Sequence, residues 1–217
     1  ISWENAFNET AARLRSIHAK YCKNAVGVYL GNPTVHNHGS LLTVFPFLNA
    51  LGTENRFSAT SVDQLAPMLA SLKMFGNQTM LPIPDIDRCN HFVCIGANPM
   101  ASNGGLMSAP GFKKRIKELQ ARGGRLITID PRKTETAAIS DEHFFVKPGS
   151  DALLLMSIVH TLFRQDLVNL GKAQNYTQGI NILRNMILGF SPEKVSPLVG
   201  IEAEDIHRIA YEFANAE

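Results

Sequence analysis

Short apolar segments alternate with longer amphipathic segments along most of the chain. The apolar runs, rich in β-branched and aromatic residues, lie at 25–30, 56–59, 92–95, 125–129 and 143–146. Apolar residues at helical spacing occupy 4–21, 41–51, 63–75, 112–121, 152–163 and 203–216. Strands that alternate with helices indicate βαβ units. We therefore predict an α/β fold, with a mainly parallel sheet that helices cover on both faces.

Several predicted helix ends carry a local signal. Ser2 is placed to cap the first helix, and Gly76 to end the helix at 63–75. Ser150 or Asp151 is expected to be the N-cap of the helix at 152–163. Pro46 lies inside a mostly apolar helix and is expected to distort it.

The composition excludes several classes of protein. The 217 residues are 45% hydrophobic and hold 21 Lys and Arg against 19 Asp and Glu. This apolar fraction suffices for a core, and the balanced charge argues against a nucleic-acid-binding surface. No run approaches the roughly 18 apolar residues of a membrane span.

The three cysteines, Cys22, Cys89 and Cys94, are odd in number, form no C-x-x-C pair and have no histidine at metal-ligand spacing. We therefore expect no zinc or iron–sulfur site from this chain alone. The cysteine pattern favours a reducing, cytoplasmic compartment.

A parallel sheet binds its ligand at the carboxyl ends of its strands, which selects the loops 96–103, 130–136 and 147–151. In the first loop, Gly96 allows close backbone approach, while Asn98 and Ser102 could hold a phosphate or sugar. The alternative is a plain turn. Neither the dinucleotide-binding glycine fingerprint nor a P-loop occurs in the sequence.

The second and third loops carry acidic residues. Asp130 could accept from ribose hydroxyls or from the N1–H and N2–H groups of guanine, and Arg132 could meet a phosphate. Alternatively, Asp130 pairs with Arg132 or caps a turn before Pro131. Gly149 and Asp151 open a helix whose N–H groups could face an anion, or merely cap it. Together the loops predict a ligand that resembles a purine nucleotide.

Five motifs follow one another in an order typical of one family. They are ISWENAF at 1–7, GNP at 31–33, IGANP at 95–99, IDPRKTETA at 129–137 and PGSD at 148–151. In order and spacing the set resembles the molybdopterin oxidoreductases of the dimethyl sulfoxide reductase superfamily, which includes formate dehydrogenases and nitrate reductases. The resemblance covers nearly the whole chain.

The resemblance implies a bis(molybdopterin guanine dinucleotide) cofactor that holds molybdenum or tungsten. Residues 58–217 would be the Rossmann-like domain that binds one guanine dinucleotide, and residues 1–57 part of a neighbouring α/β domain. The implied cofactor contacts are Gly96, Asn98, Ser102, Asp130, Arg132, Gly149 and Asp151. Family members are several hundred residues longer, so we expect a [4Fe–4S] segment before Ile1 and a further domain after Glu217.

The same resemblance implies a metal ligand just before the helix that ends in Phe75-Gly76. Asp63 occupies that position, as in respiratory nitrate reductases. Gln64 follows it, where formate dehydrogenases have histidine. The alternative is that Ser61 or Asp63 merely caps the helix.

The favoured hypothesis is that this chain is the central cofactor-binding portion of an oxidoreductase. The parent would catalyse two-electron or oxygen-atom transfer on a small substrate, with electron-transfer subunits as partners, and the fragment alone would be inactive. The alternatives are a structural module of a respiratory complex or a Rossmann-type nucleotide enzyme. The sequence assigns no acid–base role to His36, His38 or His143.

Overall fold

The computed structural model describes residues 1–105 and 109–216. The chain forms two compact units, Ile1–Leu81 and Pro82–Glu217, each described here by itself. None of the helices in the described ranges is both long and apolar enough to cross a membrane.

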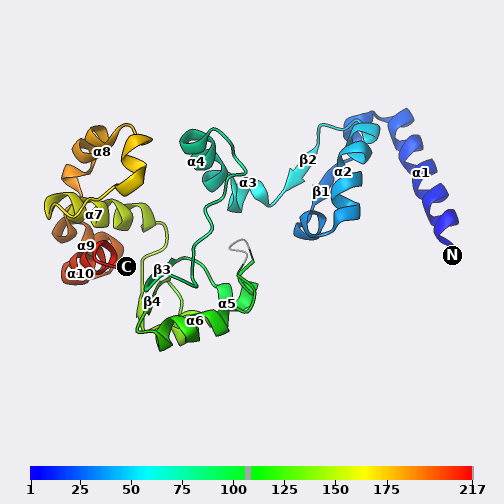
Figure 1. The fold of residues 1–217 in the computed structure, drawn as a ribbon. Helices are drawn as coiled ribbons and strands as arrows, with labels where there is room; N and C mark the ends of the chain where they lie inside the picture. Colours follow the sequence, from blue (N-terminus) through cyan, green and yellow to red (C-terminus); the bar gives the residue numbers. More distant parts are fainter. Residues whose placement is uncertain (106–108, 217) are drawn as a thin grey trace. The chain divides into compact units, whose positions relative to one another are not determined.

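The first unit is mainly helical, with one pair of short strands (Figure 1). Its elements are α1 (Trp3–Lys20), η1 (Lys23–Ala25), β1 (Val28–Leu30), η2 (Asn32–His36), α2 (His38–Leu51), β2 (Arg56–Ser58), α3 (Thr60–Asp63) and α4 (Leu65–Phe75). β1 and β2 run parallel, in a register that ends at Leu30 beside Ser58. The predicted boundary between residues 57 and 58 therefore falls inside a paired strand, whereas the compact unit ends at Leu81.

Local caps explain where the helices of the first unit begin and end. Ser2 Oγ accepts from the N–H of Asn5 at 3.2 Å, which confirms the predicted cap of α1. α2 begins earlier than predicted because the Asn37 side chain caps it. Pro46 lies within α2 without ending it, and Gly76 ends α4 in the left-handed conformation, as predicted.

The second unit carries a three-stranded parallel sheet in the order β3-β4-β5. Its elements are β3 (His91–Ile95), α5 (Pro99–Ser102), α6 (Phe112–Ala121), β4 (Arg125–Ile129), η3 (Ala137–Ile139), β5 (Glu142–Phe144), α7 (Asp151–Arg164), η4 (Gly171–Asn175), α8 (Ile180–Met186), η5 (Ile187–Gly189), α9 (Pro192–Val199) and α10 (Ala203–Ala214). The sheet and the alternation of strands with helices confirm the predicted α/β class.

β4 is buried on both faces, which shows that helices cover the sheet from both sides. Ile127 and Ile129 join a core cluster with Leu154 of α7 and Ile206 of α10. Leu126, which precedes Ile127, joins the other cluster, which contains side chains of α6. Because side chains alternate along a strand, a mostly apolar run such as RLITI at 125–129 is typical of a strand packed on both faces.

Three predicted elements differ in extent from the observed ones. The predicted strand 25–30 is observed only from Val28: Ala25 ends a 3-10 turn, and the ladder begins where Val28 N–H donates to Asn55 O. The predicted helix 63–75 is broken at Gln64, which separates α3 from α4. β5 ends at Phe144 because the backbone then leaves the sheet, and Lys147 N–H donates to Val199 O at the end of α9.

Charged residues tie α10 to the first residues of β4 and β5. The Arg208 guanidinium binds both Glu142 carboxylate oxygens, at 2.6 and 2.9 Å. Arg125 reaches Glu142 at 3.1 Å and Glu212 at 3.0 Å. This network lies at the amino end of the sheet, so the carboxyl end is left for other contacts.

Candidate nucleotide-binding site

The three predicted loops follow the carboxyl ends of three parallel strands, which meet at one edge of the sheet. The ladder continues one residue beyond β3 and β4. Gly96 N–H donates to Ile129 O at 2.9 Å, and Asp130 N–H donates to Phe144 O at 3.1 Å. Gly96 and Asp130 therefore stand at this edge, held by sheet hydrogen bonds rather than by loop contacts.

Asn98 joins the first loop to the second. Its Nδ2 donates to Glu135 Oε2 at 2.6 Å, and its Oδ1 accepts from the backbone N–H and the hydroxyl of Thr136, at 3.2 and 2.8 Å. The Thr136 hydroxyl also accepts from Met100 N–H at 3.1 Å. Loops 96–103 and 130–136 are thus one hydrogen-bonded body.

These bonds use most of the Asn98 amide. Both lone pairs of Oδ1 and one Nδ2 hydrogen are occupied, and the second Nδ2 hydrogen has no partner among the described residues, so it is available to a ligand. The bond from Asn98 also holds the pKa of the Glu135 carboxyl below its usual value. The first loop is not a plain turn, because Pro99 begins the short helix α5 immediately after Asn98.

The Asp130 side chain is largely buried, with 8% of its surface exposed. Its Oδ1 accepts from Arg132 N–H at 2.8 Å, so the turn-capping alternative is confirmed. The Arg132 guanidinium lies 3.9 Å from Glu135. Within the described residues Oδ2 makes no hydrogen bond, and this oxygen is available to a donor of a ligand.

The third loop leads into the 14-residue helix α7. Ser150 occupies the predicted N-cap position, but its hydroxyl donates to Lys147 O at 2.6 Å and does not cap the helix. Asp151 is the first helical residue, and Gly149 has a positive φ of 81° with open space where a Cβ would lie. The first turn of α7 therefore presents N–H groups without a side-chain cap, an arrangement that favours an anion.

The structure brings some of the predicted residues together and leaves others apart. Gly96, Asn98, Asp130 and Arg132 belong to the joined first and second loops. In the described ranges no hydrogen bond or ion pair links Gly149 or Asp151 to those loops. Ser102 is exposed at the end of α5.

Glu135 and Thr136 were not predicted to have a role, although both lie within the IDPRKTETA motif. Their contacts with Asn98 span 37 and 38 residues. The only available signal was that two loops after neighbouring parallel strands must face each other.

These donors and acceptors fit a purine nucleotide. The free Asp130 oxygen and the Asp151 carboxylate could accept from sugar hydroxyls or base N–H groups, and the uncapped start of α7 could receive a phosphate.

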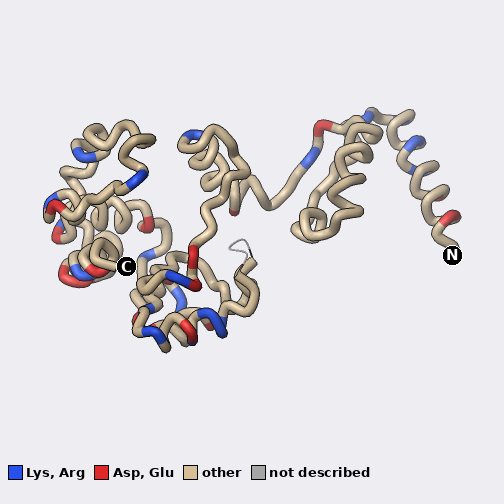
Figure 2. Tube along the Cα trace, in the orientation of Figure 1, with Lys and Arg blue, Asp and Glu red and all other residues tan. Residues whose placement is uncertain are grey.

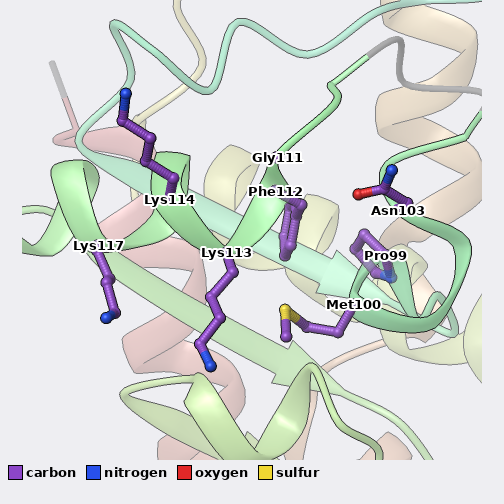
Figure 3. Close-up of a pocket in the computed structure, with 8 residues that line it drawn as sticks. All are labelled: Pro99, Met100, Asn103, Gly111, Phe112, Lys113, Lys114 and Lys117. Atoms are coloured by element: carbon purple, nitrogen blue, oxygen red, sulfur yellow. The ribbon is translucent and has the colours of Figure 1, made fainter.

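A cavity of about 480 Å³ lies between α5 and the beginning of α6 (Figure 3). Its lining residues are Pro99, Met100, Asn103, Gly111, Phe112, Lys113, Lys114 and Lys117. Basic positions follow one another along α6 (Figure 2). In Figure 3 the three lysine side chains point in different directions, so their ammonium groups do not converge on one anion. We assign no ligand to this cavity.

Asp63 belongs to the first unit, where it is exposed as the last residue of α3. The N-cap positions of α3 and α4 are Ala59 and Gln64, so the prediction that Ser61 or Asp63 caps the helix is wrong. Among the described residues, no three His, Cys, Asp or Glu side chains form a group that could hold a metal. A metal at Asp63 would therefore need ligands from elsewhere, and this assignment stays a prediction.

Similarity to known proteins extends over the whole chain. The family model for molybdopterin oxidoreductases matches residues 1–189. Formate dehydrogenase H of Escherichia coli is 28% identical over 219 residues, a match that covers 100% of this chain and 30% of that protein. Periplasmic nitrate reductase of Desulfovibrio desulfuricans is 25% identical, with coverage of 100% and 29%.

A solved structure has the same fold. Acetylene hydratase from Pelobacter acetylenicus superimposes with a TM-score of 0.78 at 26% sequence identity, over 99% of this chain and 28% of that chain. This chain thus spans about 30% of the length of the relatives that it matches.

Proposed function

This chain belongs to the molybdopterin oxidoreductase family, and on that basis we propose that its second unit binds the guanine nucleotide of a molybdopterin guanine dinucleotide. The parent protein would hold two such cofactors around molybdenum or tungsten. When bound, that metal supplies two-electron or oxygen-atom chemistry on a small substrate. The free oxygen of the buried Asp130 carboxylate, at the carboxyl edge of a parallel sheet, is the observation that carries the proposal.

The residues of the second unit hold the nucleotide in a defined way. Asp130 Oδ2 accepts from ribose hydroxyls or from the N1–H and N2–H groups of guanine. The N–H groups that open α7 beside Gly149 bind a phosphate, and Asp151 accepts from a further donor. Gly96 and Asn98 line the same edge, while Arg132 and Ser102 contribute at its rim.

The hydrogen bonds of Asn98 with Glu135 and Thr136 hold two of these loops in place before any ligand arrives. The entropy cost of ordering these two loops is therefore incurred when the chain folds and not when the ligand binds. This preorganisation is the contribution of the chain's own residues to affinity.

In the first unit we propose that Asp63 supplies an oxygen ligand to the metal. Its carboxylate is exposed and forms no ion pair within the described part of the chain. The relatives catalyse different reactions, since their names include a dehydrogenase, a reductase and a hydratase, which adds water. We therefore propose no substrate. Because the chain spans about 30% of those relatives, we propose that it does not turn over substrate alone.

Calorimetric titration of the 217-residue chain with GDP tests the nucleotide site. We expect measurable binding, and a loss of about tenfold in Asp130→Asn, since a charge-assisted hydrogen bond contributes about 1.5–3 kcal/mol. Asp166→Asn changes an exposed carboxylate after α7 and serves as the matched control. Absence of GDP binding by the folded wild-type chain would contradict the proposal.

Two measurements on the parent protein test the cofactor. Elemental analysis should find molybdenum or tungsten, and acid treatment should release GMP. Asp63→Ala should lower the metal content while released GMP stays constant, and an unchanged metal content would exclude Asp63 as a ligand.

A further inference from the structure

Phe145 is an exposed aromatic side chain immediately after β5, with 58% of its surface accessible. Its neighbours in the sequence are covered: Phe144 packs against the core of α7, α9 and α10, and Val146 is buried within it. Phe144 and Val146 both face that core, so the alternation of side chains continues past the end of β5, and Phe145 lies on the opposite face, where its ring contacts that of His143.

His143 fixes the position of this ring. The two aromatic rings meet edge to face, with centroids 4.4 Å apart and planes at 63°. His143 Nε2 lies 3.0 Å from the backbone oxygen of Asp130. His143 thus contacts both the Phe145 ring and the backbone of Asp130, the residue with the free carboxylate oxygen.

Asp130 and Phe145 are also neighbours across the strands. Ile129 pairs with Phe144, and the following hydrogen bond from Asp130 N–H to Phe144 O continues that register. Ile129 joins the same core as Phe144, so the alternation places the Asp130 side chain on the face of Phe145. A carboxylate and an exposed aromatic ring therefore flank one position at the carboxyl edge of the sheet.

We propose that Phe145 is the stacking surface for the nucleobase whose polar edge Asp130 binds. An aromatic ring binds a purine through its π face, and the carboxylate accepts from donors in the plane of the base. The contact with His143 restricts the ring before a base binds, which lowers the entropy cost of stacking. This inference rests on the proposed nucleotide site and adds the contact that recognises the base.

The test compares ligands with and without a base on the 217-residue chain. We expect Phe145→Ala and Phe145→Leu to weaken GDP binding about tenfold, since base stacking contributes roughly 1–3 kcal/mol per base. The affinity for ribose 5-phosphate, which has no base, should stay within twofold of wild type. Phe145→Trp, which keeps the aromatic face, should retain GDP binding.

Phe213→Ala is the control, because it removes an equally exposed ring, 56% accessible, from the end of α10. Circular dichroism verifies that each variant is folded. If the wild-type chain binds GDP and Phe145→Ala or Phe145→Leu binds it equally well, the stacking role is wrong while the nucleotide site stands. If the folded wild-type chain does not bind GDP, both proposals fall.

Discussion

The side-chain oxygen of Asn98 lies 2.8 Å from the hydroxyl of Thr136, across 38 residues of sequence. This bond joins the loop after β3 to the loop after β4, and Thr136 is fully buried where it forms. The proposed nucleotide site thus rests on a contact between two polar side chains that the local sequence does not reveal.

Thr136→Val should destabilise the second unit, because it removes the donor to Asn98 Oδ1 and the acceptor for Met100 N–H while preserving shape. We expect a loss of about 1–3 kcal/mol in the free energy of unfolding. Faster amide hydrogen exchange in 96–103 and 130–136 would locate the effect. Thr177→Val, which removes an exposed hydroxyl bonded to Ala173 O, should change stability little. Equal effects of the two substitutions would contradict this prediction.

Gly104→Ala should destabilise the same unit strongly. The residue has a φ of 74°, and an added Cβ would lie 2.1 Å from Ala109 O, so the backbone would have to move. Gly123→Ala is the matched control, because Gly123 has a φ of 85° with open space around it and should cost only about 1 kcal/mol. In urea denaturation we expect a clearly larger loss in the free energy of unfolding for Gly104→Ala than for Gly123→Ala. Similar losses for the two variants would contradict this prediction.

The three thiols should react at different rates. Burial raises the pKa of the Cys94 thiol to about 11, and only 4% of the residue is exposed. Burial also raises the pKa of Cys89, whereas Cys22 is exposed. At pH 8 iodoacetamide should modify Cys22 first and Cys94 on the order of 100-fold more slowly, because only the thiolate reacts. Peptide mass spectrometry measures these rates, and rapid modification of Cys94 in the folded chain would refute its burial.

The contact between α9 and α10 should weaken in acid. Glu193 Oε1 lies 3.0 Å from His207 Nε2, and this bond lowers the pKa of the Glu193 carboxyl to about 2. A depressed carboxyl pKa stabilises the fold above the unfolded value, near 4.5, and the stabilisation is lost as the pH falls toward 2. Since the Glu193 side chain is largely exposed and that of His207 is partly exposed, the effect should stay below about 1 kcal/mol.

The variant Glu193→Gln isolates that contribution. Its Tm should lie below that of the wild-type chain at pH 6, and the difference should shrink to nothing as the pH approaches 2. A Tm difference that stays constant from pH 6 to pH 2 would show that packing, and not the charge of Glu193, causes the effect.

The residue pattern predicted most of the elements of the second unit. The ranges 112–121 and 125–129 agree with α6 and β4, because a regular apolar period and a short, mostly apolar run need no tertiary information to be recognised. The short helices α5, α8 and α9 were not predicted, because a helix of four to eight residues has too few turns for a helical repeat of apolar residues to be recognised.

The sequence by itself determined the α/β class, the parallel sheet and the family motifs, because these depend on residue periodicity and on short runs of neighbouring residues. Tertiary structure alone decided which loop residues meet. Asn98 contacts Glu135 and Thr136, and Phe145 stands beside Asp130, since strand register and side-chain alternation bring together residues that are far apart in the chain. One further outcome depended on packing: Ser150, a good N-cap residue, turns its hydroxyl to Lys147 O and leaves the start of α7 open.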